Sequence, residues 1–441
     1  MKTMRHFNGE RLPQLVFYSK SGVIPYLNWN FIRKHSGVIY QETRNEDMKD
    51  VATTFLTMIN MVDVIDLYEK TKKADKKLIL SALPHMDRVD LLVTIFDPLE
   101  SYRDFKSTPE AIPFHSYQGR KMINVPMALD ITGQFLQPAY LQALADINAP
   151  PEAKGKWTAK VVKRTKDMLE ATLEQLEEIR DVATVTKIES QDRCKKLAVE
   201  SDKRPKLFGS IVGGYSEKAR LESCQALLAT NVDKLSGVVI DSFYGYHQER
   251  DGNNYFEDVY TEKVDRLLRE TIVPNLPVHL PRALFGVFFP DDILRLISAG
   301  IDLVDTSICT LLSQKGMALP SPLIDQQAAV RLRFTRMTAE EISEHSGLVD
   351  DVWPESVIDI THVGYIRANI PISCHCGCYV CTSNYSRAYL NHMLKRHELN
   401  GNILLQMHNH WTMTHFMAEV RKIIEEGNFE QLLENSNLKR F

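Results

Sequence analysis

The sequence predicts an α/β fold, a (β/α)8 barrel that carries a zinc-binding subdomain near its C-terminal end. Between residues 207 and 305, short apolar runs alternate with amphipathic stretches of helical length. This alternation is typical of parallel βα units. Polar residues directly follow several of the runs, and a barrel gathers its functional groups at the carboxyl ends of its strands. A cluster of cysteines at residues 374–381 indicates a metal site.

The composition is that of a globular protein. The chain has 441 residues, of which 44% are hydrophobic and 25% charged, enough for one large domain with an insertion or for several domains. The net charge of −4 gives no basic surplus, so nucleic-acid binding would need a local patch. The first ten residues lack the apolar core of a signal peptide, and no apolar run is long enough to span a membrane. We therefore expect a reducing compartment and metal-bound rather than disulfide-bonded cysteines.

The first hundred residues predict strands separated by helical and irregular segments. Residues 15–19, 78–83 and 91–96 are short apolar runs, which predicts three strands. The mixed apolar and polar run 51–68 predicts a helix. Prolines and aromatic residues across 98–126 favour loop or edge structure.

The middle of the chain contains a long insertion. The apolar run 140–145 ends at Asp146, and prolines and a glycine between residues 148 and 155 mark a break. From 157 to about 200 the chain has no Pro or Gly and is rich in Glu, Lys, Arg and Leu. We therefore expect a long helix or a helical hairpin at about 157–200.

The second half has the clearest βα rhythm. Ser216 is a residue type that caps helix N-termini, and Gly300 is a type that ends helices. The strands that we expect are 207–212, 237–240, 278–287 and 301–304, and the helices between them are 216–228, 255–272 and 290–299.

Several strand ends are marked by residues suited to a site. Asp146, the Gly213-Gly214 pair, Asp241 and Asp305 each follow a predicted strand. In a barrel they would meet at one rim. We assign residues 1–318 to the barrel, and residues 319–441 to the zinc-binding subdomain and to C-terminal helices that complete the barrel. In that second region we expect a polar insertion at 319–348 and helices at 383–397 and 403–426, separated by Asn400-Gly401.

The cysteine cluster predicts one structural Zn²⁺ per chain. Cys376, Cys378 and Cys381 have a spacing that lets three thiolates share one ion. His408, on the last predicted helix, supplies an imidazole as the fourth ligand. Four protein ligands leave no open position, so such an ion is structural rather than catalytic.

Other ligand choices stay open from the residues alone. Cys374 can take the place of Cys376. His397 lies near the end of the first predicted helix, and His410 lies about 200° from His408 around the second. Both histidines are therefore weaker candidates for the fourth ligand.

The residues of this region also match a longer motif. After Cys-x-Cys-x2-Cys at 376–381 come Asn-Tyr-Ser-Arg-Ala-Tyr-Leu at 384–390 and the pair His408-Asn409. This resembles the zinc motif of the tRNA-guanine transglycosylases, which exchange guanine at the tRNA wobble position for queuine or its precursor. This chain has one extra residue between Cys381 and the seven-residue stretch.

The resemblance continues upstream. Residues 208–215, Phe-Gly-Ser-Ile-Val-Gly-Gly-Tyr, look like the family's Phe-Gly-x-x-Gln-Gly-Gly segment, and 290–294 and 300–305 look like the approach to its catalytic aspartate. Together the matches cover roughly residues 10–430. The resemblance implies a (β/α)8 barrel with an inserted zinc subdomain.

The resemblance also implies roles for two aspartates. Base exchange needs one carboxylate that attacks the ribose anomeric carbon and another that handles protons. Asp305 matches the position of the nucleophile, and Asp146 matches an aspartate that recognises the base.

The chain departs from the family pattern at four places. The general-base motif Asp-Ser-Gly-Gly-Phe-Gln, expected near residues 80–120, is absent. Val212 stands where the family has a Gln, Asp241-Ser242 where it has a second Gly-Gly, and Ser307 begins the segment where it has Leu-Pro-Thr-Arg. Loss of a general base alone costs about 10²–10⁴-fold in rate. We therefore expect no catalytic residue, with Asp305 and Asp146 as vestiges.

The resemblance and the departures together imply a non-catalytic subunit of the heterodimeric queuine tRNA-ribosyltransferase. That enzyme exchanges guanine for queuine at wobble position 34 of tRNAs with GUN anticodons. This chain would pair with the catalytic paralogue, act as a scaffold and position tRNA through the complex, and alone it would form a homodimer.

The alternative is an active tRNA-guanine transglycosylase with Asp305 as nucleophile. For either function we expect a cytoplasmic protein. Relatives also imply peripheral association with the cytosolic face of the mitochondrial outer membrane.

Overall fold

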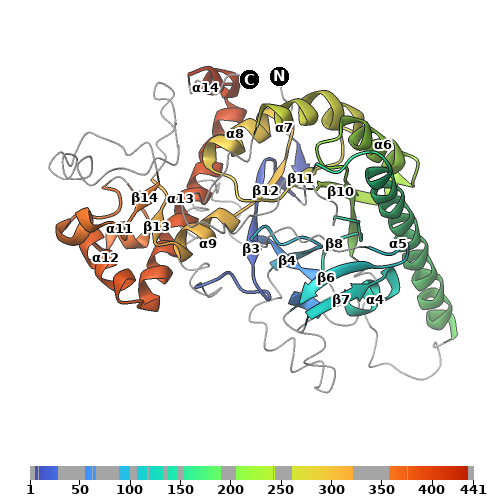
Figure 1. Cartoon of the computed structure of the whole chain (residues 1–441), viewed down its shortest axis with the longest axis horizontal. Helices are drawn as coiled ribbons and strands as arrows, with labels where there is room; N and C mark the ends of the chain where they lie inside the picture. Colours follow the sequence, from blue (N-terminus) through green and yellow to red (C-terminus); the bar gives the residue numbers. More distant parts are fainter. Residues whose placement is uncertain are drawn as a thin grey trace.

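Eight parallel strands close into a barrel in the computed structural model of this protein (Figure 1). The structure describes residues 5–7, 9–27, 55–61, 63–65, 89–99, 107–116, 119–132, 138–147, 152–189, 205–241, 243, 261–320, 357–374 and 376–435. In chain order, which is also their order around the barrel, the strands are β3 Gln14–Ser19, β4 Phe55–Asn60, β5 Val89–Thr94, β8 Tyr140–Gln142, β9 Lys206–Ile211, β10 Leu235–Ile240, β11 Arg282–Leu284 and β12 Leu303–Asp305. The predicted (β/α)8 architecture is confirmed.

The amino-terminal end of the barrel is closed by a short hairpin. Strands β1 (His6–Phe7) and β2 (Glu10–Arg11) pair in antiparallel register just before β3 begins. The Phe7 ring lies 5.1 Å from the Tyr140 ring and 5.8 Å from the Phe208 ring, measured between centroids. The barrel interior is therefore a packed core rather than a channel.

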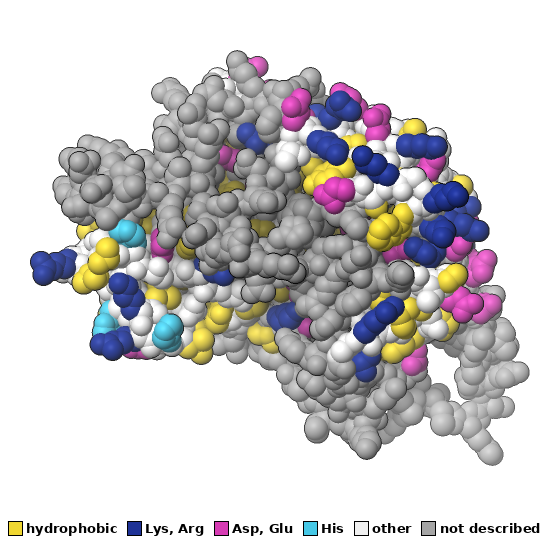
Figure 2. Space-filling view, in the orientation of Figure 1, with side chains coloured by type: hydrophobic (Ala, Val, Ile, Leu, Met, Phe, Trp, Pro, Cys, Tyr) yellow, Lys and Arg dark blue, Asp and Glu magenta, His cyan; other side chains and the backbone are white. Residues whose placement is uncertain are grey.

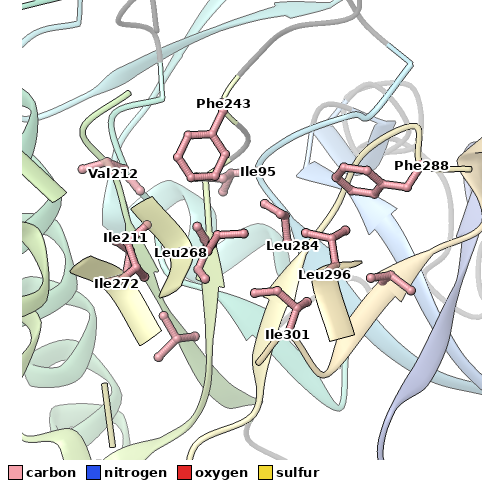
Figure 3. Packing of buried hydrophobic residues seen from close by; sticks show 14 of the residues in the cluster. Ile95, Ile211, Val212, Phe243, Leu268, Ile272, Leu284, Phe288, Leu296 and Ile301 are labelled. Atoms are coloured by element: carbon pink, nitrogen blue, oxygen red, sulfur yellow. The ribbon is translucent and has the colours of Figure 1, made fainter. Parts of the chain in front are cut away.

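Helices cover the outer face of the strands (Figure 1). They are α5 Lys156–Glu189, α6 Glu217–Leu228, α7 Glu262–Arg266, α8 Pro290–Ala299 and α9 Ser307–Gln314. Figure 3 shows the layer between, where Ile211 and Leu284 from the strands pack with Leu268 and Leu296 from helical segments. Burial of each such side chain contributes about 1.5–3 kcal/mol.

Several predicted element ends are confirmed. Helix α6 begins after Ser216, whose Oγ accepts a hydrogen bond from the Ala219 N–H (3.3 Å), and it ends at Leu228. Gly300 follows α8 with a left-handed φ of 105°. Helix α5 is one continuous helix to Glu189, and residues 190–200 of the predicted insertion lie outside the described residues.

Other predictions need correction. The predicted helix at 51–68 is wrong for residues 55–60, where the barrel strand β4 lies, whereas the described residues 61 and 63–65 are helical. All side chains of β4 from Leu56 to Asn60 are buried, and a strand buried on both faces shows no alternation that would separate it from a helix. The segment predicted as loop or edge contains a separate hairpin, β6 (Ile112–Ser116) and β7 (Gly119–Ile123), followed by α4 (Val125–Ile131).

The predicted strand at 78–83 and most of the predicted insertion at 319–348 lie outside the described residues.

The C-terminal region forms a smaller body beside the barrel (Figure 1). Its elements are β13 Met317–Ala318, β14 Ile358–Asp359, α11 Tyr379–Thr382, α12 Arg387–Lys395 and the first part of α13 Leu399–Glu425. The later part of α13 packs with α14 Phe429–Asn435 in the barrel core. Asn400-Gly401 does not separate the two main helices, since α13 already includes it. The break lies at His397, where the backbone turns left-handed (φ 56°).

Helix α13 connects this body to the barrel. The Gln406 amide donates a hydrogen bond to Thr310 Oγ1 of α9 (3.0 Å). Further along, the His410 ring stacks on Phe17 of β3, and Arg421 donates to the Pro13 carbonyl (3.3 Å). The division of domains at residue 318 stays a prediction. No helix in the described part of the chain combines the length and apolarity needed to cross a membrane.

Candidate metal centre and barrel mouth

Three thiols and one imidazole converge in the C-terminal body. The Sγ atoms of Cys376, Cys378 and Cys381 lie 3.6, 3.3 and 3.5 Å from Nδ1 of His408. All four ligand atoms lie within 4.8 Å of one another, and all four residues are buried. A tetrahedral Zn²⁺, with bonds of about 2.3 Å to sulfur and about 2.0 Å to nitrogen, separates sulfur and nitrogen by about 3.5 Å. This cluster can hold one metal ion.

Backbone N–H groups donate hydrogen bonds to two of the three sulfurs. The Cys376 sulfur accepts a hydrogen bond from the Cys378 N–H (3.5 Å), and the Cys378 sulfur accepts one from the Cys381 N–H (3.4 Å). Hydrogen bonds from the Cys376 and Cys381 thiols lower the pKa of Cys378 to about 4, and the corresponding interactions raise the pKa of Cys376. A bound ion would take the place of the shared protons.

His408 is oriented by the chain that follows α9. Its Nε2 lies 2.7 Å from the Leu319 carbonyl oxygen, so Nε2–H donates there and Nδ1 faces the thiols. Asn409 accepts a hydrogen bond from the Leu319 N–H (2.7 Å) and donates to the Met317 carbonyl and to Ser313 Oγ, each at 3.0 Å. Hydrogen bonds of this kind fix the ring of a metal ligand.

The alternative ligands lie apart from this cluster. Cys374 is exposed. His410 is buried against Phe17, with ring centroids 5.8 Å apart, and burial lowers its pKa to about 4. His397 is exposed at the end of α12.

Asp305 lies at the carboxyl end of β12 and is fully buried. One carboxylate oxygen accepts a hydrogen bond from the Gly286 N–H (2.6 Å) and the other from the Ser307 N–H (2.7 Å). Burial raises its pKa to about 7, although the hydrogen bonds from Ser307 and Gly286 act in the opposite direction. The carboxylate thus joins two strand ends and caps the turn into α9.

Asp146 lies at the carboxyl end of β8 and is also buried. Arg164 of α5 donates from Nε to one carboxylate oxygen (2.7 Å), and Ser107 Oγ donates to the other (2.7 Å). The Asp146 N–H donates to Thr165 Oγ1 (3.1 Å). These contacts fasten α5 to the strand that precedes it.

The Gly213-Gly214 turn is shaped by Arg220. A Cβ at Gly213, whose φ is 134°, would lie 2.9 Å from the Arg220 backbone nitrogen, so only glycine fits beneath α6. The buried Arg220 guanidinium donates to the carbonyls of Ile211, Gly214 and Asp241 at 2.7, 2.9 and 3.1 Å. It also lies 4.3 Å from the centroid of the Phe243 ring, and burial lowers its pKa to about 10. This cation holds the ends of β9 and β10 together.

Among the buried carboxylates that the sequence interpretation missed, Asp97 bears most directly on the site, because it influences Asp305. It follows β5, accepts hydrogen bonds from Lys20 Nζ (2.7 Å) and from the Tyr18 hydroxyl (3.1 Å), and acts electrostatically to raise the pKa of Asp305. Lys20 also lies 3.6 Å from Asp63. The available signal was that an aspartate directly follows the predicted strand 91–96. This aspartate was not recognised as a site residue because the Gly-Gly of the family motif does not follow it.

Residues 96–440 match the family model described as queuine tRNA-ribosyltransferase, which is most of the chain. The chain belongs to the queuine tRNA-ribosyltransferase family. In this family member, the cysteine and histidine cluster predicted from the zinc motif is complete. The strand-end aspartates are present but bonded to the chain's own groups.

Two accessory-subunit relatives match over nearly the whole length, and a bacterial relative matches over about half. A protein of Aedes aegypti named queuine tRNA-ribosyltransferase accessory subunit 2 is 25% identical over 427 residues, 96% of this chain and 84% of that protein. The Homo sapiens protein of the same name is 24% identical over 434 residues, 96% of this chain and 91% of that protein. The queuine tRNA-ribosyltransferase of Nitrosomonas europaea is 31% identical over 225 residues, 51% of this chain and 47% of that protein.

Proposed function

We propose that this chain is the non-catalytic subunit of a heterodimeric queuine tRNA-ribosyltransferase. Its partner is the catalytic member of the family, and the pair exchanges guanine for queuine at position 34 of tRNAs with GUN anticodons. This chain contributes the scaffold, the dimer contact and a surface that positions tRNA. The relatives named as accessory subunits, which match along almost all of this chain, support the proposal.

The observation that carries the proposal is the state of the barrel mouth. The carboxylates of Asp305 and Asp146 are buried and bonded to backbone N–H groups, Arg164 and Ser107. A nucleophile must present a free oxygen to the anomeric carbon, and a base-recognition carboxylate must face the base. Here both groups hold the protein's own elements together instead.

We propose Zn²⁺ as the ion of the cysteine cluster, one per chain and structural. Three sulfurs and one imidazole nitrogen in a tetrahedral arrangement are the ligand set that Zn²⁺ prefers. The hydrogen bond from His408 Nε2–H to the Leu319 carbonyl, and those that Asn409 accepts from the Leu319 N–H and donates to Met317 and Ser313, would couple the ion to β13 and α9.

The partner would dock on the exposed side of this zinc-binding body. Tyr379, Tyr385 and Tyr389 form a row, with centroids of successive rings 6.1 and 6.0 Å apart. Tyr379 is 40% exposed and Tyr389 is 50% exposed. Aromatic side chains of this kind are enriched in protein interfaces. The catalytic member of the family is the occupant that the relatives' subunit names support.

Exchange of labelled guanine into tRNA tests the catalytic half of the proposal. The purified chain alone should show no exchange, and the heterodimer should be active. Asp305→Asn in this chain should leave heterodimer activity unchanged, whereas removal of the matching aspartate in the catalytic subunit should abolish it. Exchange by this chain without a partner would overturn the proposal.

A second candidate is an active transglycosylase with Asp305 as nucleophile. Asp97 favours it, because a second buried carboxylate lies close enough to influence Asp305. The same assay separates the two functions, since this one requires Asp305→Asn to abolish exchange.

Size-exclusion chromatography with the paralogue, with zinc measured in each peak, tests the pairing. Tyr379→Ala with Tyr389→Ala should weaken co-elution and leave the zinc content at one per chain. The location stays a prediction from the resemblance: the cytoplasm, with the cytosolic face of the mitochondrial outer membrane as a second site. Subcellular fractionation tests it.

A further inference from the structure

A row of lysines covers the N-terminal half of α5. Lys154, Lys156, Lys160 and Lys163 are exposed, as is Trp157, and we call these five residues the α5 basic patch. Residues 152–167 hold six Lys and Arg against two acidic residues, a formal charge of +4 in a chain whose net charge is −4. Figure 2 shows Lys and Arg side chains gathered on the side of the molecule that carries α5.

The positive charge of the patch is not compensated within the described part of the chain. The neighbouring cations Arg164 and Lys166 pair with Asp146 and Glu170. The described ion pairs include none for the four lysines of the patch. Their charge is therefore available to a ligand outside the chain.

The order of charges along α5 is also the opposite of the order that stabilises a helix. Carboxylates stabilise the N-terminal turn of a helix and cations the C-terminal turn. The first turn of α5 contains no acidic residue and begins with Lys156, while Glu170, Glu174 and Glu177 follow further along. Helix stability does not explain this order, whereas attraction of an external anion does.

The patch also lies at the rim of the barrel mouth. Helix α5 follows the carboxyl end of β8, and Arg164 fastens it to Asp146 there. Lys156, Lys160 and Lys163 are spaced so that they share one face of the helix. The opposite face, with Val161, Met168 and Leu169, is buried against the barrel, so α5 has no apolar face to insert into a lipid bilayer.

We propose that the α5 basic patch binds the phosphate backbone of tRNA. The lysines contact phosphates without regard to sequence, and Trp157, which is 40% exposed, stacks on an unpaired base. This inference rests on the proposed function and gives its tRNA-positioning role a surface. It accounts for RNA contact in a chain whose overall charge is acidic.

The test is tRNA binding by the heterodimer, measured by fluorescence anisotropy at several salt concentrations with a labelled tRNA that has a GUN anticodon. The triple variant K156Q/K160Q/K163Q should bind at least tenfold more weakly at low salt. The slope of log K against log salt should fall in magnitude by about 2, because three phosphate contacts are lost. Trp157→Ala should weaken binding about fivefold or more with an unchanged slope.

The matched control is K234Q/K395Q/K422Q, which removes the same charge from exposed lysines in C-terminal turns of other helices. It should bind tRNA like wild type. If the two triple variants weaken binding equally, or if the patch variant keeps the wild-type salt slope, the inference is wrong.

The two proposals fail in different ways. A patch variant that still co-elutes with the catalytic subunit but binds tRNA normally overturns this inference and leaves the proposed function intact. A wild-type chain that does not pair overturns the proposed function. A patch variant that loses only its binding to vesicles of phosphatidylcholine and phosphatidylserine assigns the patch to a membrane surface and overturns the RNA proposal.

Discussion

The cysteine cluster and the barrel mouth are two buried polar sites with opposite organisation. In the cluster, three sulfurs and the Nδ1 atom of His408 face one another, so the polar atoms of the site are directed toward its own centre. At the mouth, each buried carboxylate faces a donor from another part of the chain: N–H groups for Asp305, Arg164 for Asp146 and Lys20 for Asp97.

This difference separates a site that needs an occupant from one that does not. Once deprotonated, three thiolates and an imidazole nitrogen are all electron-pair donors that repel one another, so the cluster gains stability when a cation enters. The carboxylates at the mouth already accept hydrogen bonds from the protein, although burial outweighs these bonds at Asp305, and a ligand there would have to displace them. The same fold therefore contains one site that needs a bound ion and a second site whose buried groups are hydrogen-bonded within the protein.

The largest effect is expected when a ligand is removed from the cysteine cluster. Cys378→Ser should lose the bound zinc and lower the melting temperature sharply, since structural Zn²⁺ contributes about 10 kcal/mol or more to folding. Cys374→Ser, a change at an exposed cysteine outside the cluster, is the matched control and should alter neither quantity. Elemental analysis measures the zinc content of each variant, and thermal denaturation measures its melting temperature. A Cys378→Ser protein with one zinc per chain would contradict the assignment.

At the mouth, the titration of Asp305 should appear in the stability curve. Its pKa of about 7 in the folded state lies above the ordinary value of 3.8, so the folded state holds the proton more tightly. The free energy of unfolding should therefore fall by about 4 kcal/mol as pH rises from about 4 to about 7. Asp305→Asn should flatten this part of a urea-denaturation series. The same slope in both proteins would show that Asp305 does not titrate there.

Asn409 tests the connection between the two sites. Asn409→Ala removes hydrogen bonds to Leu319, Met317 and Ser313, all buried, and should cost about 3 kcal/mol of unfolding free energy. Asn402→Ala is the control, because it removes one half-buried bond to the Ser313 carbonyl and should cost about 1 kcal/mol. Equal costs would mean that Asn409 does not join the cluster to the barrel.

The smallest effect is expected at Lys20. Lys20→Met leaves Asp97 and Asp63 buried without their cation, which should cost about 2 kcal/mol at neutral pH, because a side chain 31% exposed is partly screened by water. Lys218→Met is the control, since Lys218 is 86% exposed, and it should cost little. Chemical denaturation of both variants at neutral pH measures the two costs, and equal costs would mean that Lys20 does not stabilise the buried carboxylates.

The cysteine cluster could be predicted because most of its ligands lie close together in the sequence. Three of its ligands lie within six residues, and the spacing of Cys376, Cys378 and Cys381 already restricts the geometry. Only His408 is remote, and the motif that contains His408-Asn409 supplied it. The carboxyl-end position of Asp146 and Asp305 followed in the same way from strands that end in a polar residue.

The parts that sequence reasoning missed depend on partners far apart in the chain. The sequence around β4 predicts a helix because burial on both faces removes the alternation that marks a strand. The role of Arg220 depends on three carbonyls from two different strand ends. Asp97 was visible as a residue, but its compensation by Lys20 requires the barrel to be closed.

Helix α13 has a mechanical consequence. Its 27 residues form a rod about 40 Å long, with His408 about a third of the way along it and Arg421 about 20 Å further on. A pivot of about 5° at His408 would swing Arg421 by almost 2 Å, by simple geometry over that length. Such a swing would exceed the tolerance of its 3.3 Å bond to Pro13 at the start of β3. Helix α13 would therefore transmit a displacement of the C-terminal body, such as one caused by a bound partner, directly to β3.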